Sequence, residues 1–143
     1  MNNDWKHPLT KRGTLVQEMG ETTPFVFKDR LYRLENWQKF FEIPGSKPGD
    51  NFMEDCVRIW DVELNKVVST PLVGHSFGIA FVHNKTVYVF ATRHEADRPW
   101  RHFRFISMTK STDLSNWTAP ITVIEAEDNE HLFNTAVCYD GHR

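Results

Sequence analysis

Cysteine is scarce in this chain of 143 residues, and neither sign of charge is in large excess. Its only cysteines, Cys56 and Cys138, lie far apart, each in a strand-like run. Because no secretory signal indicates an oxidising compartment, we expect two buried thiols, with a disulfide as the weaker alternative. The net charge is −2, with basic and acidic residues interspersed. Binding to a phosphate backbone needs a basic stripe, so nucleic acid is not an expected partner.

Long hydrophobic runs are missing as well. No run approaches the ~20 apolar residues of a membrane-spanning helix. The N-terminal stretch MNNDWKHPLTKRG lacks the apolar core of a signal peptide. We therefore expect no membrane partner and a cytoplasmic location for the chain as it stands, although a larger precursor is compatible with the same residues.

Several motifs of catalysis and cofactor binding are also absent. The sequence has no G-x-x-x-x-G-K and no G-x-G-x-x-G, so no nucleotide cofactor is expected. Its one match to G-x-S-x-G is GHSFG, 74–78, which opens the second predicted hairpin and does not stand at a strand-to-helix turn. Its seven histidines show neither i, i+4 nor H-x-H spacing, and the cysteines are not clustered. We therefore expect no bound metal and no other cofactor.

The chain does contain a repeated β-hairpin pattern, rich in aromatic residues (11 Phe, 5 Trp and 3 Tyr). Residues 24–35, PFVFKDRLYRLE, are an apolar run, a charged turn and a second, alternating run. The pattern recurs 56 residues later, with Phe25 matched by Phe81 and Tyr32 by Tyr88. A further 56 residues lead to the final run, AVCYDGHR. A fixed long period of hairpins is typical of repeat folds, and a β-propeller blade fits this length.

The predicted fold class is therefore all-β, with incomplete propeller-type blades of four antiparallel strands. Residues 1–20 are expected to form an arm, either with a short strand at 14–16 that closes the ring or as a frayed tail. The blades are expected at about 21–72 and 75–126, and a third begins within 130–143. The expected strands are 23–27, 31–34, 56–61 and 67–70 in blade one, and 77–83, 86–92, 103–109 and 121–125 in blade two.

Three local features complete this prediction. Pro71 is expected to end the fourth strand, because proline removes a ladder donor. The Ser/Thr/Asp cluster in 111–120 predicts a single helical turn, and 132–139 predicts the first strand of blade three. Two blades and one strand leave an apolar face and an unpaired edge exposed. We therefore expect either a truncated chain or a homo-oligomer formed through the exposed blade edge.

One segment points to a known group of proteins. The stretch STDLSNWTAP, 111–120, closely resembles the S-x-D-L-x-x-W-x-x-P segment that closes blades in the five-bladed β-propeller glycoside hydrolases of families 43, 32 and 117. PFVFKDRLYRL and TAVCYDGHR look like the hairpins that open blades in the same group. The resemblance covers about 22–143 and implies roughly half of a five-bladed propeller. It also implies that Trp117 is structural and packs the outer turn of its blade.

The resemblance implies carboxylates at positions where this chain has hydroxyls. Members of the group usually place an aspartate before the proline of the first blade and another at the start of the third. Here Thr23 precedes Pro24, and Thr135 stands at the third-blade position. Threonine cannot act as a carboxylate base near neutral pH. Either neighbouring carboxylates have taken over, or the chain is not catalytic by that route.

Glycoside hydrolysis needs two carboxyl groups, about 5 Å apart for retention and roughly 6.5–9.5 Å apart for inversion. In a propeller, the starts of the innermost strands lie at the mouth of the axial pocket. The acids nearest these starts are Glu21 and Glu130, and Asp55 precedes the third strand of blade one. These three are the candidate catalytic residues, with Glu95 and Asp97 as further acids in a loop. The alternative for Glu21 is a solvated turn residue, and that for Glu130 is a residue of an ordinary interblade loop.

Five polar or aromatic residues are candidates for substrate binding. Trp100 and Arg101 can form a sugar platform, in which the indole stacks on a pyranose ring and the guanidinium holds hydroxyls or a carboxylate. His131 and Asn134 belong to the polar cluster NEHLFN, and His75 opens blade two among small residues. Packing between blades or at a strand start is the structural alternative.

The sequence thus predicts a glycoside hydrolase-like protein that acts on, or derives from one acting on, a polysaccharide or oligosaccharide by carboxylate acid/base chemistry. This prediction is based mainly on the resemblance, and fold does not determine function. The alternative is a non-catalytic carbohydrate-binding module, which the two threonines favour. A purely structural, self-assembling repeat is the third possibility.

Overall fold

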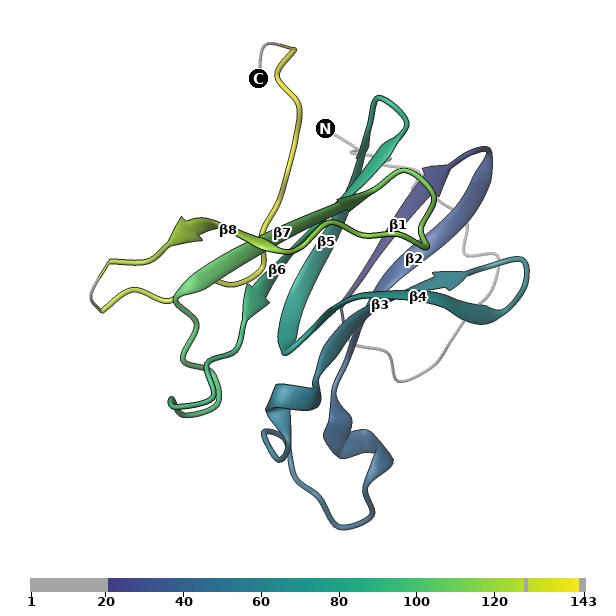
Figure 1. Ribbon diagram of the computed structural model, residues 1–143. Coiled ribbons are helices and arrows are strands. Elements are labelled where there is room, and N and C mark those ends of the chain that lie inside the picture. Colours follow the sequence, from purple (N-terminus) through teal and green to yellow (C-terminus); the bar gives the residue numbers. More distant parts are fainter. Residues whose placement is uncertain (1–20, 128, 142–143) are drawn as a thin grey trace, which may run out of the picture.

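The computed structural model describes residues 21–127 and 129–141, so the predicted arm and its strand at 14–16 lie outside the described residues. The chain forms two four-stranded antiparallel sheets with strand orders β1-β2-β3-β4 and β5-β6-β7-β8 (Figure 1). The strands are β1 (Thr22–Phe27), β2 (Arg30–Trp37), β3 (Cys56–Asp61), β4 (Lys66–Val73), β5 (His75–His83), β6 (Thr86–Arg93), β7 (Phe105–Ser111) and β8 (Ile121–Glu125). Two short 3-10 helices, η1 (Lys39–Glu42) and η2 (Phe52–Glu54), lie between β2 and β3. The predicted all-β class with two four-stranded antiparallel sheets is confirmed, and over the described residues the sheets form an open pair.

The first hairpin of each sheet has the same register and the same turn. Phe25 pairs with Tyr32 in the β1–β2 hairpin, and Phe81 pairs with Tyr88 in the β5–β6 hairpin. Both turns consist of two residues with positive φ, 50° and 61° in the first hairpin and 46° and 59° in the second. Such turns have the backbone twist that the flanking strands require. Residues 56 positions apart in the sequence therefore occupy equivalent positions in the two hairpins.

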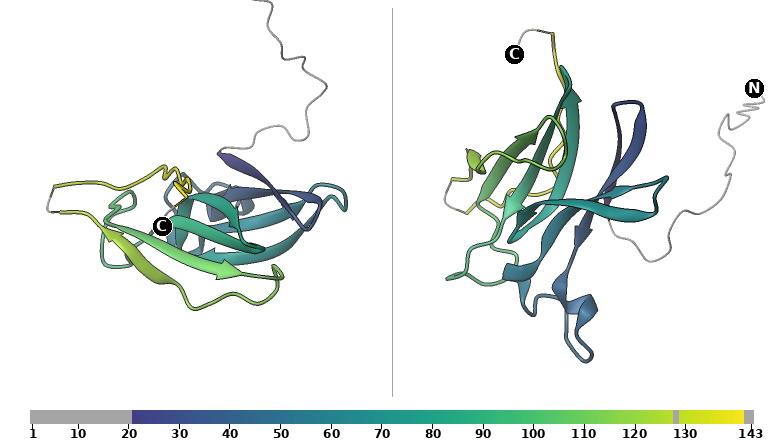
Figure 2. Two further views of the ribbon diagram at one scale, coloured as in Figure 1. Left: turned by 90° about the horizontal axis from the view of Figure 1, so that it is seen from above. Right: turned by 45° about the vertical axis from the view of Figure 1, so that its right-hand side comes forward.

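The two sheets pack face to face through β5, which crosses β1, β2 and β3 (Figure 2). A Cβ added at Gly78 of β5 would stand 2.7 Å from Val57 Cγ1 and 3.0 Å from Leu34 Cδ2. Glycine therefore allows β5 to approach the first sheet more closely than any other residue would. Buried side chains from both sheets form one hydrophobic core, whose members are Phe25, Phe27, Tyr32, Leu34, Val57, Ile59, Leu72, Ala80, Val87, Val89, Ala91 and Leu114.

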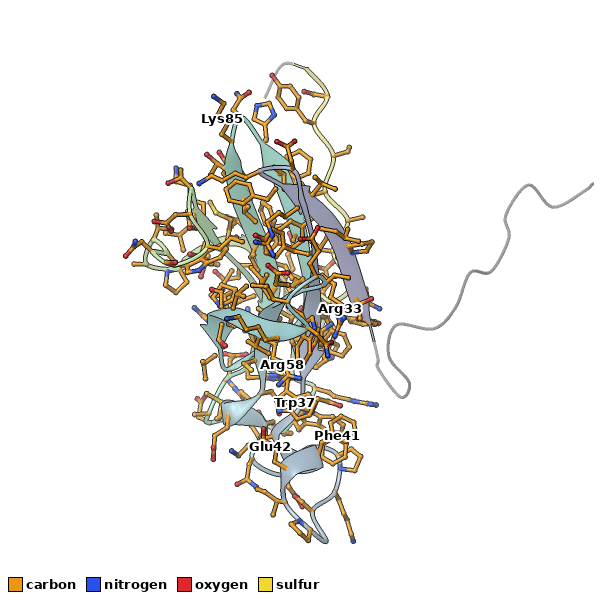
Figure 3. The ribbon with its side chains drawn as sticks, turned by 90° about the vertical axis from the view of Figure 1, so that its right-hand side faces the viewer. Arg33, Trp37, Phe41, Glu42, Arg58 and Lys85 are labelled. Atoms are coloured by element: carbon orange, nitrogen blue, oxygen red, sulfur yellow. The ribbon has the colours of Figure 1, made fainter. Side chains whose placement is uncertain are left out.

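A charged cluster lies on the opposite face of the first sheet. Glu35 is 1% exposed and accepts hydrogen bonds from Arg33 Nε and Arg58 Nε, both at 2.8 Å. The guanidinium of Arg58 lies 3.8 Å from the ring centroid of Trp37, and that of Arg33 lies 4.7 Å from Trp60 (Figure 3). Each arginine thus has a carboxylate and an aromatic ring as partners, which offsets the cost of removing the charges from water.

Six of the eight strands differ from their predicted bounds by one to three residues at one or both ends, β4 and β7 among them. Pro71 does not end the fourth strand, because β4 continues to Val73. β4 is the edge strand of its sheet, and its pairing with β3 contains register shifts, so the missing N–H of proline is tolerated there. β7 begins at Phe105 and ends at Ser111, two residues later at each end than predicted.

The segment 111–120 contains no helical turn, contrary to the prediction. Ser111 Oγ accepts from the backbone N–H groups of Asp113 and Leu114, and Asp113 Oδ1 accepts from those of Ser115 and Asn116. These side chains compete with helical hydrogen bonds and produce successive bends. The bonds to the Asn116 backbone and side chain hold the pKa of Asp113 far below its usual range.

Trp117 follows these bends and connects the sheets. It is partly buried and packs against the common core. Its indole N–H donates to Ser69 Oγ at 2.8 Å, on β4 of the first sheet. The structural role that the resemblance implied for this tryptophan agrees with these contacts.

The expected strand at 132–139 is not formed over the described residues, since no backbone ladder pairs with it. It is anchored at its start, where Leu132 N donates to Phe103 O and Leu132 O accepts from Thr92 Oγ1.

The prediction that both thiols are buried is wrong. Both cysteines are free, but Cys56 is half-buried and Cys138 is exposed on this unpaired segment. No helix in the described part of the chain has the length and apolar character needed to cross a membrane.

Candidate functional site

Two adjoining cavities lie at one end of the paired sheets. β1 and β5 both begin at this end, near η1 and η2 (Figure 1). The smaller cavity has a volume of about 210 Å³ and the larger about 350 Å³, and the two share Phe77 and Arg101. The smaller one is also lined by Glu21, Asn36, Gln38, Phe41, Ser76 and Trp100, and the larger one by Phe103, His131, Phe133 and Asn134.

Glu21 immediately precedes β1 and is the carboxylate that lines the smaller cavity. The side-chain amide of Asn134, with its nitrogen turned toward Glu21, donates to Oε2 at 2.9 Å and to Oε1 at 3.0 Å. Asn36 connects the same region to β5, because its Nδ2 donates to Glu21 O at 3.3 Å and its Oδ1 accepts from Gly78 N at 3.0 Å. Two segments far from Glu21 in sequence thus contact it, Asn134 at its carboxylate and Asn36 at its backbone carbonyl.

Three of the lining residues have a left-handed backbone: Phe77 (φ 55°), Arg101 (φ 72°) and Asn134 (φ 55°). This conformation is common for asparagine but rare for a bulky residue, where it costs of the order of 1–3 kcal/mol. Phe77 also lies within a register shift of β5, between Ser76 and Ile79. Such a bulge redirects a side chain, and here the redirected ring becomes a wall of both cavities.

Trp100 is packed so that it supports Arg101. A Cβ added at Gly49 would stand 2.6 Å from Trp100 Cε3, so the backbone of that loop lies directly against the indole. The guanidinium of Arg101 lies 4.4 Å from the indole centroid. These contacts occupy part of the ring surface that was expected to stack on a sugar. The indole therefore holds the guanidinium at the wall shared by both cavities.

His131 lines the larger cavity, whereas Glu130 lines neither. The His131 ring meets the edge of His102, with centroids 5.9 Å apart, and His102 Nδ1 lies 3.0 Å from Glu95 Oε2. Glu130 Oε2 accepts from Glu127 N at 3.1 Å in an exposed turn. The arrangement of Glu130 is that of a turn residue, the alternative considered from the sequence.

Asp55 belongs to a buried polar cluster behind the cavities. It is 2% exposed, and its Oδ1 accepts from Lys39 N at 2.7 Å. Its Oδ2 lies 3.8 Å from His94 Nε2, and the same nitrogen lies 3.0 Å from Ser76 Oγ. In a Ser-His-Asp catalytic triad the two partners bind different ring nitrogens, and the serine is accessible. This cluster therefore connects the two sheets and does not form an activated nucleophile.

Burial disfavours the charged form of each titratable group in the cluster. It raises the pKa of Asp55 to about 6, against the opposing hydrogen bond from Lys39 N. Burial, together with a smaller contribution from the nearby His75, lowers the pKa of His94 to about 4. Burial also lowers the pKa of His75, whose Nδ1 bonds Val73 O at 2.8 Å. His75 is 6% exposed and lines neither cavity, so its proposed role in binding stays a prediction.

The cluster also involves the single residue between the sheets. Gly74 joins β4 to β5 with φ 71°. Its N–H donates to Asp55 O at 2.7 Å, and its carbonyl accepts from His94 N at 2.8 Å. This glycine is thus bonded both to the start of β3 and to the residue after β6.

The structure brings together five of the residues that the sequence singled out: Glu21, Trp100, Arg101, His131 and Asn134. The sequence analysis missed the aromatic walls, Phe77 and Phe133, and the connecting Asn36. No sequence pattern marked Phe77 as a cavity residue, since its left-handed backbone depends on the packing of β5. Asn36 had a weak one, as a polar residue directly after an alternating strand.

Comparison with protein-family models, with curated proteins and with solved structures gave no match to this chain. Within the described residues, no group of three or more His, Cys, Asp or Glu side chains is arranged to hold a metal ion. The function therefore has to be argued from the geometry of the two cavities.

Proposed function

We propose that the chain is a propeller-type protein that binds a carbohydrate in the two adjoining cavities. The observation behind this proposal is the convergence of Glu21, Asn134 and Arg101 with the aromatic wall of Phe77. A sugar presents hydroxyls at its rim and C–H groups on its faces. A carboxylate, an amide and a guanidinium can bind the hydroxyls, while aromatic rings cover the C–H faces.

The repeat supports the propeller part of the proposal. Two sheets with identical first hairpins, stacked through their first strands, have the relation of neighbouring blades. In that arrangement the starts of the first strands surround the axis, which is where both cavities lie. The exposed β8 supports self-association, since Ile121, Val123 and Ile124 are 55%, 40% and 49% exposed on an edge strand.

Glycoside hydrolysis is the second candidate function. Glu21 favours it, because a carboxylate held by an amide at the cavity wall can act as an acid, a base or a nucleophile. Hydrolysis also needs a second carboxyl group within about 10 Å. Asp55 is buried behind the cavities and Glu130 is engaged in its own turn. Binding without hydrolysis is therefore the main proposal.

Calorimetric titration of the full chain with a panel of neutral and uronic-acid oligosaccharides tests the proposal. We expect at least one oligosaccharide to bind with a Kd of about 1 mM or better, and Glu21→Gln to weaken it about tenfold. Glu63→Gln is the matched control, since Glu63 is 65% exposed and remote from the cavities. Absence of binding by the whole panel would refute the proposal.

Two further measurements separate the alternatives. Release of reducing ends by the native chain, abolished by Glu21→Gln, would establish the hydrolase, whereas binding without release would leave a binding protein. Light scattering at several protein concentrations tests whether the chain self-associates through the exposed edge strand β8. We expect a dimer or larger species, which Val123→Lys on β8 should dissociate. A monomer at all concentrations would contradict the oligomer.

A further inference from the structure

The larger cavity differs from the smaller one in the character of its polar residues. Its lining consists of three phenylalanines together with Arg101, His131 and Asn134. Among the described residues that line it, none is a carboxylate. Glu21 lines the smaller cavity and accepts from the amide of Asn134, and Glu95, which contacts His102, lines neither cavity. The larger cavity therefore presents mainly hydrogen-bond donors and a positive charge within an apolar wall.

Arg101 is the source of that charge. Over residues 21–127 and 129–141, no carboxylate forms an ion pair with its guanidinium. Its guanidinium carbon lies over the indole of Trp100, 4.4 Å from the ring centroid. Stacking on a ring leaves the N–H groups at the edge of a guanidinium free to donate.

The position of Arg101 is specified by its surroundings. Its own backbone is left-handed, and the supporting indole is confined by Gly49, which also has positive φ (96°). Although Arg101 is exposed, its backbone and its supporting ring are both constrained. Loop 43–51 and the connection between β6 and β7 thus cooperate to hold one cation at the wall shared by both cavities.

We propose that the larger cavity binds a carboxylated sugar, namely a uronic-acid unit of an oligosaccharide, with its carboxylate on Arg101. This inference rests on the proposed carbohydrate function and specifies its substrate class. A guanidinium matches a carboxylate through two parallel N–H···O bonds, and the three phenylalanine rings match the C–H surface of the sugar. Glu21 repels a second carboxylate from the smaller cavity, which therefore takes a neutral sugar.

Titration of the full chain with two trisaccharides of the same linkage, one of galacturonate and one of galactose, tests the inference. At about 50 mM salt, where charge interactions are weakly screened, we expect the acidic ligand to bind about ten- to hundredfold more tightly. Arg101→Gln should remove this preference, and Arg101→Lys should retain part of it. Circular dichroism on each variant verifies that the sheets are intact.

Arg98→Gln is the matched control, because Arg98 is an exposed arginine of the same connection and lines neither cavity. It should leave the preference unchanged. Equal affinity of the native chain for the two trisaccharides would overturn the inference while leaving carbohydrate binding in place. Binding of neither would overturn both, and a preference that survives Arg101→Gln would overturn the role of Arg101.

Discussion

Replacing Asp55 with asparagine is expected to change the dependence of fold stability on pH. The side chain is 2% exposed, and asparagine keeps an oxygen that can accept from Lys39 N. The substitution therefore removes a titrating group while preserving its shape and its principal hydrogen bond. Because His94 Nε2 lies 3.8 Å from Asp55 Oδ2, the two titrations have to be considered together.

For Asp55, burial raises the pKa from 3.8 to about 6 in the folded chain. The folded chain thus binds this proton more tightly than the unfolded chain over that interval. The free energy of unfolding contributed by Asp55 is fully present below pH 3.8 and falls as the pH rises to about 6. At about 1.4 kcal/mol for each pH unit, the loss amounts to about 3 kcal/mol.

For His94, burial has the opposite consequence. Its pKa falls from 6.5 to about 4, so the unfolded chain binds this proton more tightly. Its contribution to the free energy of unfolding is therefore fully present above pH 6.5 and is lost as the pH falls to about 4, again by about 3 kcal/mol. The lowered pKa of His75 has the same sign. In the native chain the contributions of Asp55 and His94 largely cancel.

Urea unfolding followed by tryptophan fluorescence at several values between about pH 4 and 6.5 measures this balance. Relative to the native chain, Asp55→Asn should gain about 3 kcal/mol across the interval, and His94→Gln should lose about 3 kcal/mol. Since only slopes are compared, a uniform destabilisation of either variant does not affect the result. Parallel pH profiles for Asp55→Asn and the native chain would refute the reasoning, because they would mean that Asp55 is solvated.

Three further substitutions test the packing. Gly78→Ala should lower the free energy of unfolding by about 1–3 kcal/mol in urea titrations. Part of this lost stability should be recovered when Val57 is also changed to alanine. No recovery would argue against the close approach of β5. Glu35→Ala should cost about 3–5 kcal/mol, because it leaves two arginines without their buried carboxylate, and a loss below about 1 kcal/mol would show that water reaches the cluster. Trp117→Phe should cost about 1 kcal/mol through its lost hydrogen bond, and the cost should shrink in a chain that already has Ser69→Ala.

The features that were predicted from the sequence are those determined by residues close together in the chain. The hairpins were predictable because alternating apolar residues and two-residue turns determine pairing within a few positions, as Phe25 and Tyr32 show. The end of the sheets that holds the cavities was also predictable. Glu21 was singled out because it precedes an inner strand, and it does line a cavity there.

What escaped prediction depends on contacts between distant segments. The left-handed backbone of Phe77 and the packing of Gly49 against Trp100 arise only once the two sheets and their loops are assembled. Asp55, Ser76 and His94 have no sequence spacing that indicates a cluster, since β3, β5 and β6 bring them together. Glu130 lines neither cavity and accepts a hydrogen bond within its own turn, so its catalytic role stays a prediction.

The single residue between β4 and β5 has a mechanical consequence. Gly74 is hydrogen-bonded to Asp55, next to the first sheet, and to His94, next to the second, so it forms a hinge between the two sheets. Twisting one sheet against the other at this end breaks both bonds, whereas the hairpin tips lie at the opposite end (Figure 1). Thermal opening should therefore widen the tips first. The cavities lie beside this hinge, so separation of the hairpin tips should preserve their shape. A ligand should therefore meet a site that is already formed.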